Sequence, residues 1–241
     1  MNGSSTDMRI DHSAKDLDYH TFRDRAEAAL ALAEKFKDRT FDDPLVLAIP
    51  RGGVVTGSVL AKELKAELDV VLVRKLRAPS QPELAVGAIG ENGEVYLNHD
   101  GKNVPGLSDE YIEQEKQRES EVIVKRKKVY RAIRPQAPVA GRSVVVTDDG
   151  IATGSTIIAA LQIVRSKKPK ELLVAVPIAP IDRLEIIKGY CNEVVCLLMP
   201  HLFLAVGQAY KDFTAVDDKE VVEILKSTLP TRSRHKHQAV G

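Results

Sequence analysis

Short apolar runs that alternate with helical patterns constrain the fold of this 241-residue chain more than any other feature. The runs are rich in Val, Ile and Leu, keep their charges at the ends, and comprise residues 44–49, 69–75, 143–148, 171–179 and 193–199. Apolar residues recur at helical spacing before and between them, at 22–36, 54–66, 155–168 and 181–190. This alternation predicts an α/β fold with a doubly wound, mostly parallel sheet that helices cover on both faces.

Two other elements separate the second and third of these strands. Residues 87–98 read as a β-hairpin, with Asn92-Gly93 as the turn dipeptide. A long charged helix follows over 108–134, with Ser108 as its predicted N-cap. Its acidic start and basic end suit the helix dipole. We therefore expect a small hairpin insertion, followed by a helix, within an otherwise regular α/β domain.

The charge balance argues against a polyanionic partner. Lys and Arg number 35 and Asp and Glu 34, and a net charge of +1 creates no global field toward nucleic acid or a membrane surface. The basic cluster at 125–128 is then expected to be a solvated helix end, although it could be a nucleic-acid patch. Residues 1–12 lack the apolar core of a signal peptide, and no run is long enough to span a membrane, so we expect a cytoplasmic protein.

We expect one domain at 21–228, with a flexible N-terminus at 1–20 and a flexible basic tail at 229–241. The chain shows no internal repeat or low-complexity block that would divide it. Its two cysteines, Cys191 and Cys196, are too few for a disulfide framework and lie in a strand-like stretch. They are predicted to be buried free thiols rather than metal ligands.

Ligands of open parallel sheets bind at the carboxyl ends of the strands, where the strand order reverses. The residues that end the predicted strands are Ile49, Lys75, Thr147, Ala179 and Met199. The chemistry of this chain should therefore lie in the loops that follow them.

One of these loops belongs to the stretch VVVTDDGIATGST, residues 144–156. Gly150 and Gly154 let its backbone turn tightly and approach a ligand. Its amides open onto a helix N-terminus, which forms an anion cradle, and hydroxyl side chains add neutral donors. The loop lacks the lysine of a Walker A motif and the glycine pattern of a dinucleotide-binding loop. We interpret it as a cradle for one phosphate group.

The adjacent carboxylates of Asp148 and Asp149 would repel a phosphate that they touched. They make sense if they accept hydrogen bonds from a diol, or hold a hydrated Mg²⁺, at a short distance from that phosphate. A sugar phosphate satisfies both requirements. The alternative is that the two aspartates only cap the turn, while the glycines shape it.

A second loop, PRGG at 50–53, follows the strand at 44–49 and also opens onto a helix. Its two glycines form another backbone anion site, and Arg51 offers a guanidinium fork for phosphate oxygens, unless the loop only shapes a turn. Two anion sites and a diol-reading acid pair together describe a sugar that carries a phosphate group at each end.

These residues resemble the type I phosphoribosyltransferases. VVVTDDGIATGST is similar to that family's signature for phosphoribosyl pyrophosphate (PRPP), and PRGG is similar to its pyrophosphate loop, which often contains a cis peptide. More loosely, FRDRAEA near the start and AVGQAYKDF near the end look like a subgroup of stand-alone phosphoribosyltransferases whose acceptors are unsettled. The family resemblance spans residues 44–200, and the looser likeness extends it to 20–225.

The resemblance implies transfer of the phosphoribosyl group of PRPP to a small nitrogenous acceptor, with release of pyrophosphate and with Mg²⁺ as cofactor. Asp148 and Asp149 would bind the ribose hydroxyls and, directly or through water, Mg²⁺, and with Arg51 they are the expected catalytic residues. The 5′-phosphate would be held by Gly150, Ile151, Ala152, Thr153, Gly154, Ser155 and Thr156. Pyrophosphate would be held by Arg51, Gly52, Gly53 and Lys75.

The resemblance also implies how the site is covered. Residues 76–104 would form a mobile loop that excludes water, and residues 200–228 a C-terminal hood over the acceptor. His201, as acid or base, and Phe203, as a stacking surface, are the acceptor-pocket candidates, unless the aromatic residues there only pack the hood. Hypoxanthine-guanine enzymes of the family carry an acidic base where this chain has Ala152, so the acceptor must be a ready nucleophile or find its base elsewhere.

Two other function classes fit the same residues. A regulator that binds PRPP without turnover would keep both loops, but such proteins usually add a winged helix or a basic face. An enzyme of another class, such as a phosphohydrolase, would need a nucleophile or a metal cluster that the sequence does not show. Homodimers are common in the resembling family, which by analogy makes a homodimer the candidate assembly.

Overall fold

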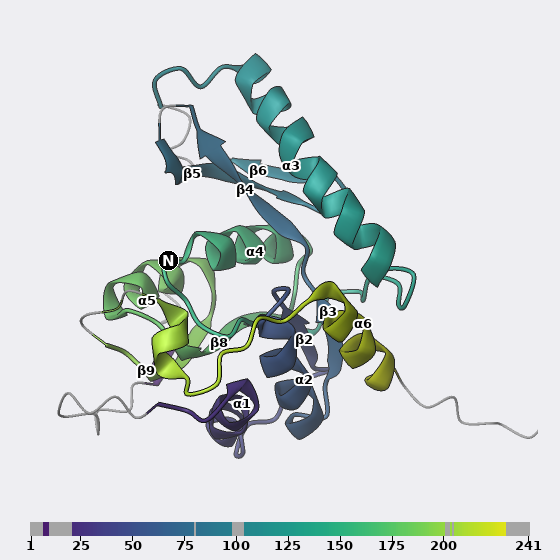
Figure 1. The fold of residues 1–241 in the computed structure, drawn as a ribbon, viewed down its shortest axis with the longest axis vertical. Coiled ribbons are helices and arrows are strands. Elements are labelled where there is room, and N and C mark those ends of the chain that lie inside the picture. The colour runs from purple at the N-terminus through teal and green to yellow at the C-terminus, as the bar shows by residue number, and fades with distance from the viewer. Residues whose placement is uncertain are drawn as a thin grey trace, which may run out of the picture.

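The computed structural model describes residues 7–9, 21–79, 81–97, 104–200, 203 and 205–229. Its main element is a six-stranded sheet in the order β1-β9-β8-β7-β2-β3, in which every pairing is parallel (Figure 1). The strands are β1 Asp7–Arg9, β2 Leu45–Ala48, β3 Glu67–Val70, β7 Ser143–Thr147, β8 Glu171–Ile178 and β9 Glu193–Leu198. The predicted parallel α/β sheet is confirmed.

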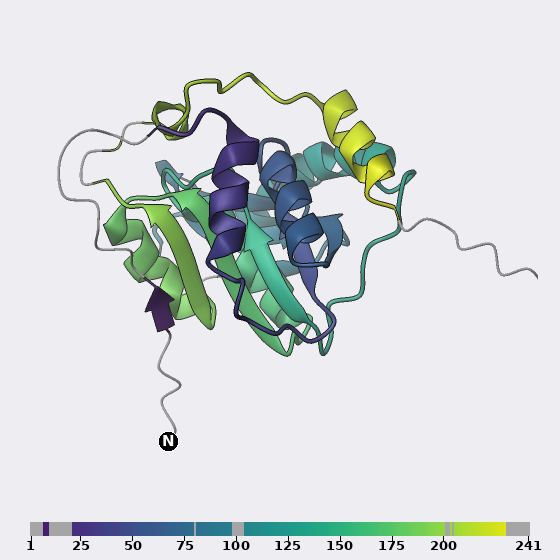
Figure 2. The ribbon, with the colours of Figure 1, turned by 90° about the horizontal axis from the view of Figure 1, so that it is seen from below.

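Helices cover both faces of this sheet (Figures 1 and 2). They are α1 Arg25–Glu34, α2 Gly53–Glu63, α4 Ser155–Ser166, α5 Ile181–Ile187 and α6 Asp218–Ser227. Successive strand residues point to opposite faces, so Leu45 and Leu47 pack with α4 and α5, whereas Val46 and Ala48 pack with α1, α2 and α6. Because both faces are buried, the strands are apolar at almost every position.

The predicted strand at 69–75 is wrong, because this run belongs to two different sheets. Its first residues end β3, and the chain leaves the main sheet after Val70. Its last residues begin β4 Val73–Ala78, which pairs antiparallel with β5 Gln81–Gly90. Lys75 therefore lies inside β4 and not at the end of a main-sheet strand. A continuous apolar run shows that residues are buried, but not where the chain changes sheet.

A small antiparallel sheet, β4-β5-β6, stands out from the main sheet and carries the long helix α3 Asp109–Tyr130 beside it (Figure 1). β6 Val95–Leu97 completes the predicted hairpin, and Gly93 in its turn adopts a φ of +80°, a left-handed conformation that favours glycine. Ser108 caps α3 as predicted, since its hydroxyl accepts a 3.1 Å hydrogen bond from a first-turn amide. The described part of 76–104 is thus largely regular strand, and its movement stays a prediction.

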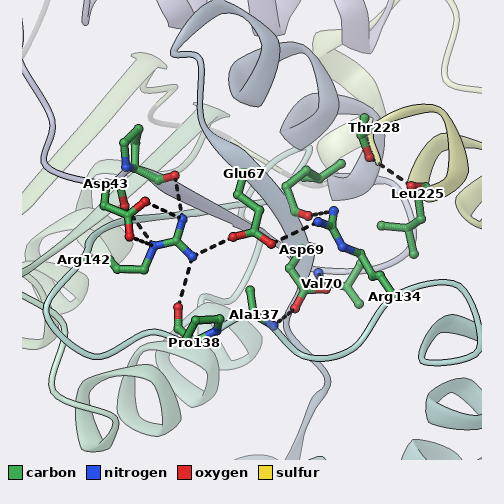
Figure 3. A network of polar contacts seen from close by, with 12 residues as sticks. Asp43, Glu67, Asp69, Val70, Arg134, Ala137, Pro138, Arg142, Leu225 and Thr228 are labelled. Carbon is green, nitrogen blue, oxygen red and sulfur yellow. Dashed lines mark hydrogen bonds and ion pairs between the residues drawn. The ribbon is translucent and has the colours of Figure 1, made fainter. Parts of the chain in front are cut away.

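A network of buried charges joins the far end of α3 to the edge strand β3. Asp69 is fully buried and accepts a 2.7 Å hydrogen bond from Arg131, which also binds Glu91 in the hairpin at 2.8 Å. Beside this pair, Glu67 accepts a 2.7 Å hydrogen bond from Arg142 (Figure 3). These contacts fix the antiparallel sheet and α3 on the main sheet, because removing one partner of a buried pair leaves the other charge uncompensated.

The two cysteines are confirmed as buried thiols that form no disulfide. Cys191 lies just before β9 and Cys196 within it. Burial raises the pKa of each thiol to about 12. Both side chains therefore act as small apolar groups of the core.

Most of the two predicted flexible ends lies outside the described residues. The exceptions are Leu229 and the strand β1, which extends the sheet beyond β9. The sequence does not predict β1, since Asp7–Arg9 lacks an apolar run. Within the described ranges, the helices are all too short or too polar to cross a membrane.

Candidate functional site

The two predicted ligand loops emerge side by side from neighbouring strands. β2 and β7 pair in register, with Ala48 opposite Thr147, and the amide of Ile49 donates a 2.9 Å hydrogen bond to the carbonyl of Thr147. From β2 the chain moves to β3 on one side, whereas from β7 it moves to β8 and β9 on the other. The strand order therefore reverses between β2 and β7, and loops 50–53 and 148–156 begin at this reversal.

The PRGG loop lies directly against the acid pair, Asp148 and Asp149. A Cβ atom added to Gly52 would lie 1.9 Å from Oδ2 of Asp149, and one added to Gly53 would lie 2.8 Å from Oδ1 of Asp148. Both distances are too short for any side chain, which explains the two glycines. The backbone of one loop and the carboxylates of the other thus form a single site.

Cationic groups surround the PRGG loop. Arg51 is exposed, and its peptide bond with Pro50 is cis. A hollow of about 50 Å³ beside Pro50 is lined in part by Arg74, Arg126 and Thr156. Sequence reasoning missed the two lining arginines, which come from β4 and α3, because their approach to the loop depends on how the antiparallel sheet folds back. Arg74 is paired at 2.6 Å with Glu119 and Arg126 lies 3.9 Å from Asp218, so exposed Arg51 is the loop's own cation for an anion.

The loop after the acid pair has the geometry of an anion site. Gly154 adopts a φ of +79° and directly precedes Ser155, the first residue of α4. No side chain caps this helix N-terminus, so its first amides are not satisfied by a cap. The hydroxyls of Thr153 and Ser155 lie 3.1 Å apart at an exposed position of the same loop. These donors and the helix dipole favour a bound phosphate.

Ile151 anchors this loop to the sheet. Its side chain is buried, and its amide donates a 2.9 Å hydrogen bond to the carbonyl of Ile178 in β8. Gly150 beside it leaves no room for a side chain, since an added Cβ would lie 2.5 Å from Cγ1 of Val206. The amide of Ile151 is thus already used, and the stretch 152–156 is left as the part that can face a phosphate.

The two carboxyl groups of the acid pair have different surroundings. Asp148 accepts a 2.9 Å hydrogen bond from the amide of Asp149, and burial together with the charge of Asp149 raises the pKa of Asp148 well above its usual range. Asp149 instead accepts a 2.7 Å hydrogen bond from Nε of Arg25 in α1. Its backbone carbonyl accepts a 2.5 Å hydrogen bond from the hydroxyl of Tyr210. The pair therefore combines one carboxylate in an ion pair with one carboxyl that resists ionisation.

Sequence reasoning missed both partners of Asp149. Arg25 belongs to FRDRAEA and Tyr210 to AVGQAYKDF, the two stretches of looser resemblance, but they lie 124 and 61 residues from Asp149 and nothing in the sequence connects them with it. A signal for Arg25 was present, because it shares the buried face of α1 with Ala29 and Leu32. A charged residue on an apolar helix face needs a buried partner.

The aromatic residues of the C-terminal segment pack against the core beside the site. Tyr210 is buried in a cluster with Ala209 and Ile178, and Phe203 is partly buried against the same cluster. Tyr210 is thus a core side chain, while a stacking role of Phe203 stays a prediction. His201, the other acceptor-pocket candidate, lies outside the described residues.

The acid pair is the candidate position for Mg²⁺. In the part of the chain that the structure describes, no group of three or more His, Cys, Asp or Glu side chains lies together. Mg²⁺ usually keeps several waters and binds one or two carboxylates together with substrate phosphates. Two carboxylates beside two anion sites supply that kind of ligand set. The residues thus fit a Mg²⁺ that binds together with a phosphorylated substrate.

Residues 23–211, which include both loops and the acid pair, match the family model of the phosphoribosyl transferase domain, and the chain belongs to this family. Two curated relatives, "Putative phosphoribosyl transferase Rv0571c" and "Putative phosphoribosyl transferase MT0597", come from two strains of Mycobacterium tuberculosis. Each is 43% identical over 207 residues, which is 85% of this chain and 46% of the relative. The crystal structure of TT1426 from Thermus thermophilus is 43% identical, with a TM-score of 0.83 over 87% of this chain and 100% of its own.

The chain spans about half the length of the curated relatives that it matches. What those whole proteins do is therefore not carried over to it directly. The family and the fold read from the two loops are confirmed. The activity is argued below from the site.

Proposed function

We propose that this protein transfers the 5-phosphoribosyl group of PRPP to a nitrogenous acceptor and releases pyrophosphate, the reaction of a pentosyl glycosyltransferase. The observation that carries the proposal is the contact between loop 50–53 and the acid pair at the reversal of strand order. This contact sets two anion sites around two carboxylates, which matches the order of phosphate, diol and diphosphate in PRPP. Membership of the phosphoribosyl transferase family supports the same reaction.

Each part of PRPP has a chemically matched group in the site. The 5′-phosphate fits the stretch 152–156 at the N-terminus of α4. The ribose hydroxyls fit the acid pair, whose carboxylates accept hydrogen bonds. Pyrophosphate fits the amides of the PRGG loop and the guanidinium of Arg51, with Arg126 lining the neighbouring hollow.

During transfer, the bond between ribose C1 and the pyrophosphate oxygen breaks, and its electron pair leaves with pyrophosphate. The acceptor nitrogen supplies the electron pair of the new bond to C1. Negative charge builds on the leaving oxygen, where Arg51 and the PRGG amides stabilise it. The acid pair holds the ribose hydroxyls and so fixes C1 relative to both reactants. Mg²⁺ bound with PRPP would neutralise part of the pyrophosphate charge.

The proton of the acceptor must go to a base outside the phosphate loop. Ala152 is exposed in that loop, where its methyl group cannot take a proton. An acceptor nitrogen that is already nucleophilic at neutral pH fits this arrangement best. The proposed acceptor-pocket residues are His201 and Phe203, which belong to the proposed hood at 200–228.

A regulator that senses PRPP without turnover is the second candidate. Its basic face would come from the cluster 125–128 near the end of α3. In the structure Lys127 donates hydrogen bonds to the carbonyl of Glu91 at 3.0 Å and to the side chain of Asn92 at 2.8 Å. Arg126 lines the hollow beside the PRGG loop. Because Lys127 is hydrogen-bonded within the molecule and Arg126 lines the hollow beside the PRGG loop, the cluster supports the enzyme better than a nucleic-acid surface.

We further propose a cytoplasmic location and a homodimer, both by analogy with the family. Light scattering on the purified chain checks the assembly. A mass of about twice the 26.5 kDa of the chain is expected, and a monomer at all concentrations would contradict the dimer.

PRPP binding tests the proposal most directly. Calorimetry with and without Mg²⁺ should show Mg²⁺-dependent binding to the wild type and loss of binding in the Asp148→Asn/Asp149→Asn double variant. Pyrophosphate release can then be screened across nitrogenous acceptors. A wild type that binds no PRPP under any Mg²⁺ condition rules out the proposed enzyme, and binding without release on any acceptor favours the regulator.

A further inference from the structure

Arg25 is a buried cation that reaches the acid pair from outside both ligand loops. It lies at the start of α1 and is 8% exposed. Its Nε donates a 2.7 Å hydrogen bond to Oδ2 of Asp149, whose side chain is 13% exposed. Neither PRGG nor VVVTDDGIATGST contains this residue; it belongs to FRDRAEA, a stretch of the looser resemblance to which no role is attached.

Two more contacts hold the Arg25 guanidinium in place. One of its terminal nitrogens, Nη1, donates a 2.9 Å hydrogen bond to the backbone carbonyl of Thr214. Its central carbon lies 3.9 Å from the ring centroid of Phe213, which is the distance of a cation–π contact. Phe213 stacks in turn on Tyr210, with ring centroids 5.1 Å apart. The guanidinium is thus fixed by the C-terminal segment before it meets Asp149.

The Tyr210 hydroxyl contacts the same aspartate, Asp149. It donates to the backbone carbonyl of Asp149, so the side chain and the backbone of one residue are both held by groups from outside the loop. Gly52 of the PRGG loop lies beside both groups, since an added Cβ would lie 1.9 Å from this Oδ2 and 3.2 Å from Nε of Arg25. The carboxylate of Asp149 therefore has one fixed orientation, with Oδ2 taken by Arg25.

The positive charge of Arg25 also has an electrostatic effect on the acid pair. Two adjacent carboxylates beside a phosphate loop would repel one another and the ligand phosphates. A cation at 2.7 Å from one of them cancels much of this repulsion, since the interaction of charges is strong at short range and low exposure. Arg25 therefore compensates part of the negative charge that the acid pair places beside the phosphate loop.

We propose that Arg25 is a positioning residue for ribose binding, which orients Asp149, neutralises it beside the phosphate loop and ties it to the C-terminal segment. The proposal rests on the proposed PRPP site. It assigns to Arg25 an effect on the sugar end of the ligand and none on pyrophosphate alone. A purely structural ion pair would affect folding without this distinction.

The test compares three probes by calorimetry in the presence of Mg²⁺: PRPP, ribose 5-phosphate and pyrophosphate. Arg25→Gln should weaken PRPP and ribose 5-phosphate binding about 10–100-fold, as loss of a group that orients a ligand-binding side chain commonly does. Its affinity for pyrophosphate should stay within about twofold of the wild type, because the PRGG loop is left unchanged. Arg25→Lys, which keeps the charge but not the fork, should recover part of the loss.

Arg142→Gln is the matched control. Arg142 is also buried and paired with a carboxylate, but it lies in the network around β3 (Figure 3), away from both loops. It should lower thermal stability without changing the affinity for any probe. Phe213→Ala is the second variant in case Arg25→Gln does not fold, since Phe213 is 37% exposed and removing its ring loosens the guanidinium. It should weaken PRPP and ribose 5-phosphate binding and spare pyrophosphate.

The outcomes separate this inference from the proposed function. A wild type that binds none of the phosphoribosyl probes overturns both. A wild type that binds PRPP, together with Arg25→Gln or Phe213→Ala variants of unchanged PRPP affinity, overturns the role of Arg25 alone. Equal losses for PRPP and pyrophosphate also overturn it, because they show general damage to the site.

Discussion

Gly53 lies so close to Asp148 that a Cβ atom at position 53 would lie 2.8 Å from both the Cα and the Oδ1 of the aspartate. The PRGG loop and the acid pair are therefore packed backbone to side chain, with no side chain between them. Gly52 stands in the same relation to Asp149. The site depends on this close approach, which can be tested at each glycine.

Gly53→Ala should separate the two loops and weaken PRPP binding about tenfold or more. Overpacking of this kind costs about 1–3 kcal/mol, and about 1.4 kcal/mol is a tenfold change in affinity. Calorimetry with PRPP and Mg²⁺ measures the effect. Gly189→Ala is the control, because an added Cβ there meets nothing within 4 Å. Unchanged affinity in Gly53→Ala would show that the loops need not touch.

Asp148→Asn should stabilise the ligand-free protein at neutral pH. The folded-state pKa of Asp148 is raised, so the folded protein holds a proton that the unfolded chain releases, and stability falls as pH rises through the raised pKa. Asparagine keeps the oxygen that accepts the hydrogen bond from the Asp149 amide, and because it does not titrate, it removes this pH-dependent loss of stability. We expect about 1 kcal/mol of added stability, a common gain at functional positions, and about 2–4 °C in Tm.

Thermal unfolding at several pH values measures this difference. The gap between variant and wild type should widen from acidic to neutral pH, because over that window the Asp148 carboxyl ionises in the unfolded chain while the folded wild type keeps its proton. Asp182→Asn, at an exposed position of α5, serves as the control and should show no such trend. An Asp148→Asn variant less stable than the wild type across the whole pH range would contradict the burial argument.

Asp69→Ala should destabilise the fold by about 3–5 kcal/mol, since it leaves Arg131 without one buried partner. The side chain of Asp69 also accepts hydrogen bonds from the amides of Val70 and Ala137, which would lose their acceptor. Urea unfolding gives the free-energy difference. The exposed pair of Lys226 with Glu223 offers a control, and Lys226→Gln should change stability by less than about 1 kcal/mol.

The native thiols should resist alkylation at pH 8. Burial raises the pKa of Cys191 and Cys196 to about 12, so the reactive thiolate is rare and the sulfur atoms are out of reach. Mass spectrometry after treatment with iodoacetamide should find both cysteines unmodified in the native protein and modified after denaturation. Rapid labelling of the native protein would show that β9 opens easily.

The parts of the site that the sequence predicts are those formed by residues that are neighbours in the chain. The acid pair, the glycines and the hydroxyls of loop 148–156 follow one another in the chain, and their residue types fit a phosphate and a diol without further information. The helix cap at Ser108 and the turn at Gly93 are likewise local. Each of these features depends on a few neighbouring residues, so their sequence alone is sufficient.

The parts that sequence reasoning missed depend on contacts between distant residues. Arg25 and Tyr210 reach Asp149 across 124 and 61 residues, and no spacing rule connects them. The misplacement of Lys75 has a different cause. The run at 69–75 is buried throughout, and burial does not distinguish a strand that continues from a chain that turns into a second sheet.

The hydrogen bond from Ile49 to Thr147 joins residues almost a hundred positions apart and sets the distance between the two ligand loops. After β3 the chain passes through the antiparallel sheet and α3 and then returns to the main sheet as β7. β3 and β7 lie on opposite sides of β2. The distance between the two loops is set by the pairing of β2 with β7 and does not depend on how long this insertion is. A longer insertion would add little to the entropy cost of closing the chain. The main-sheet pairing that positions the two candidate ligand loops is thus independent of the length of the inserted antiparallel sheet and α3, so that insertion can vary in length while the spacing of the loops is kept.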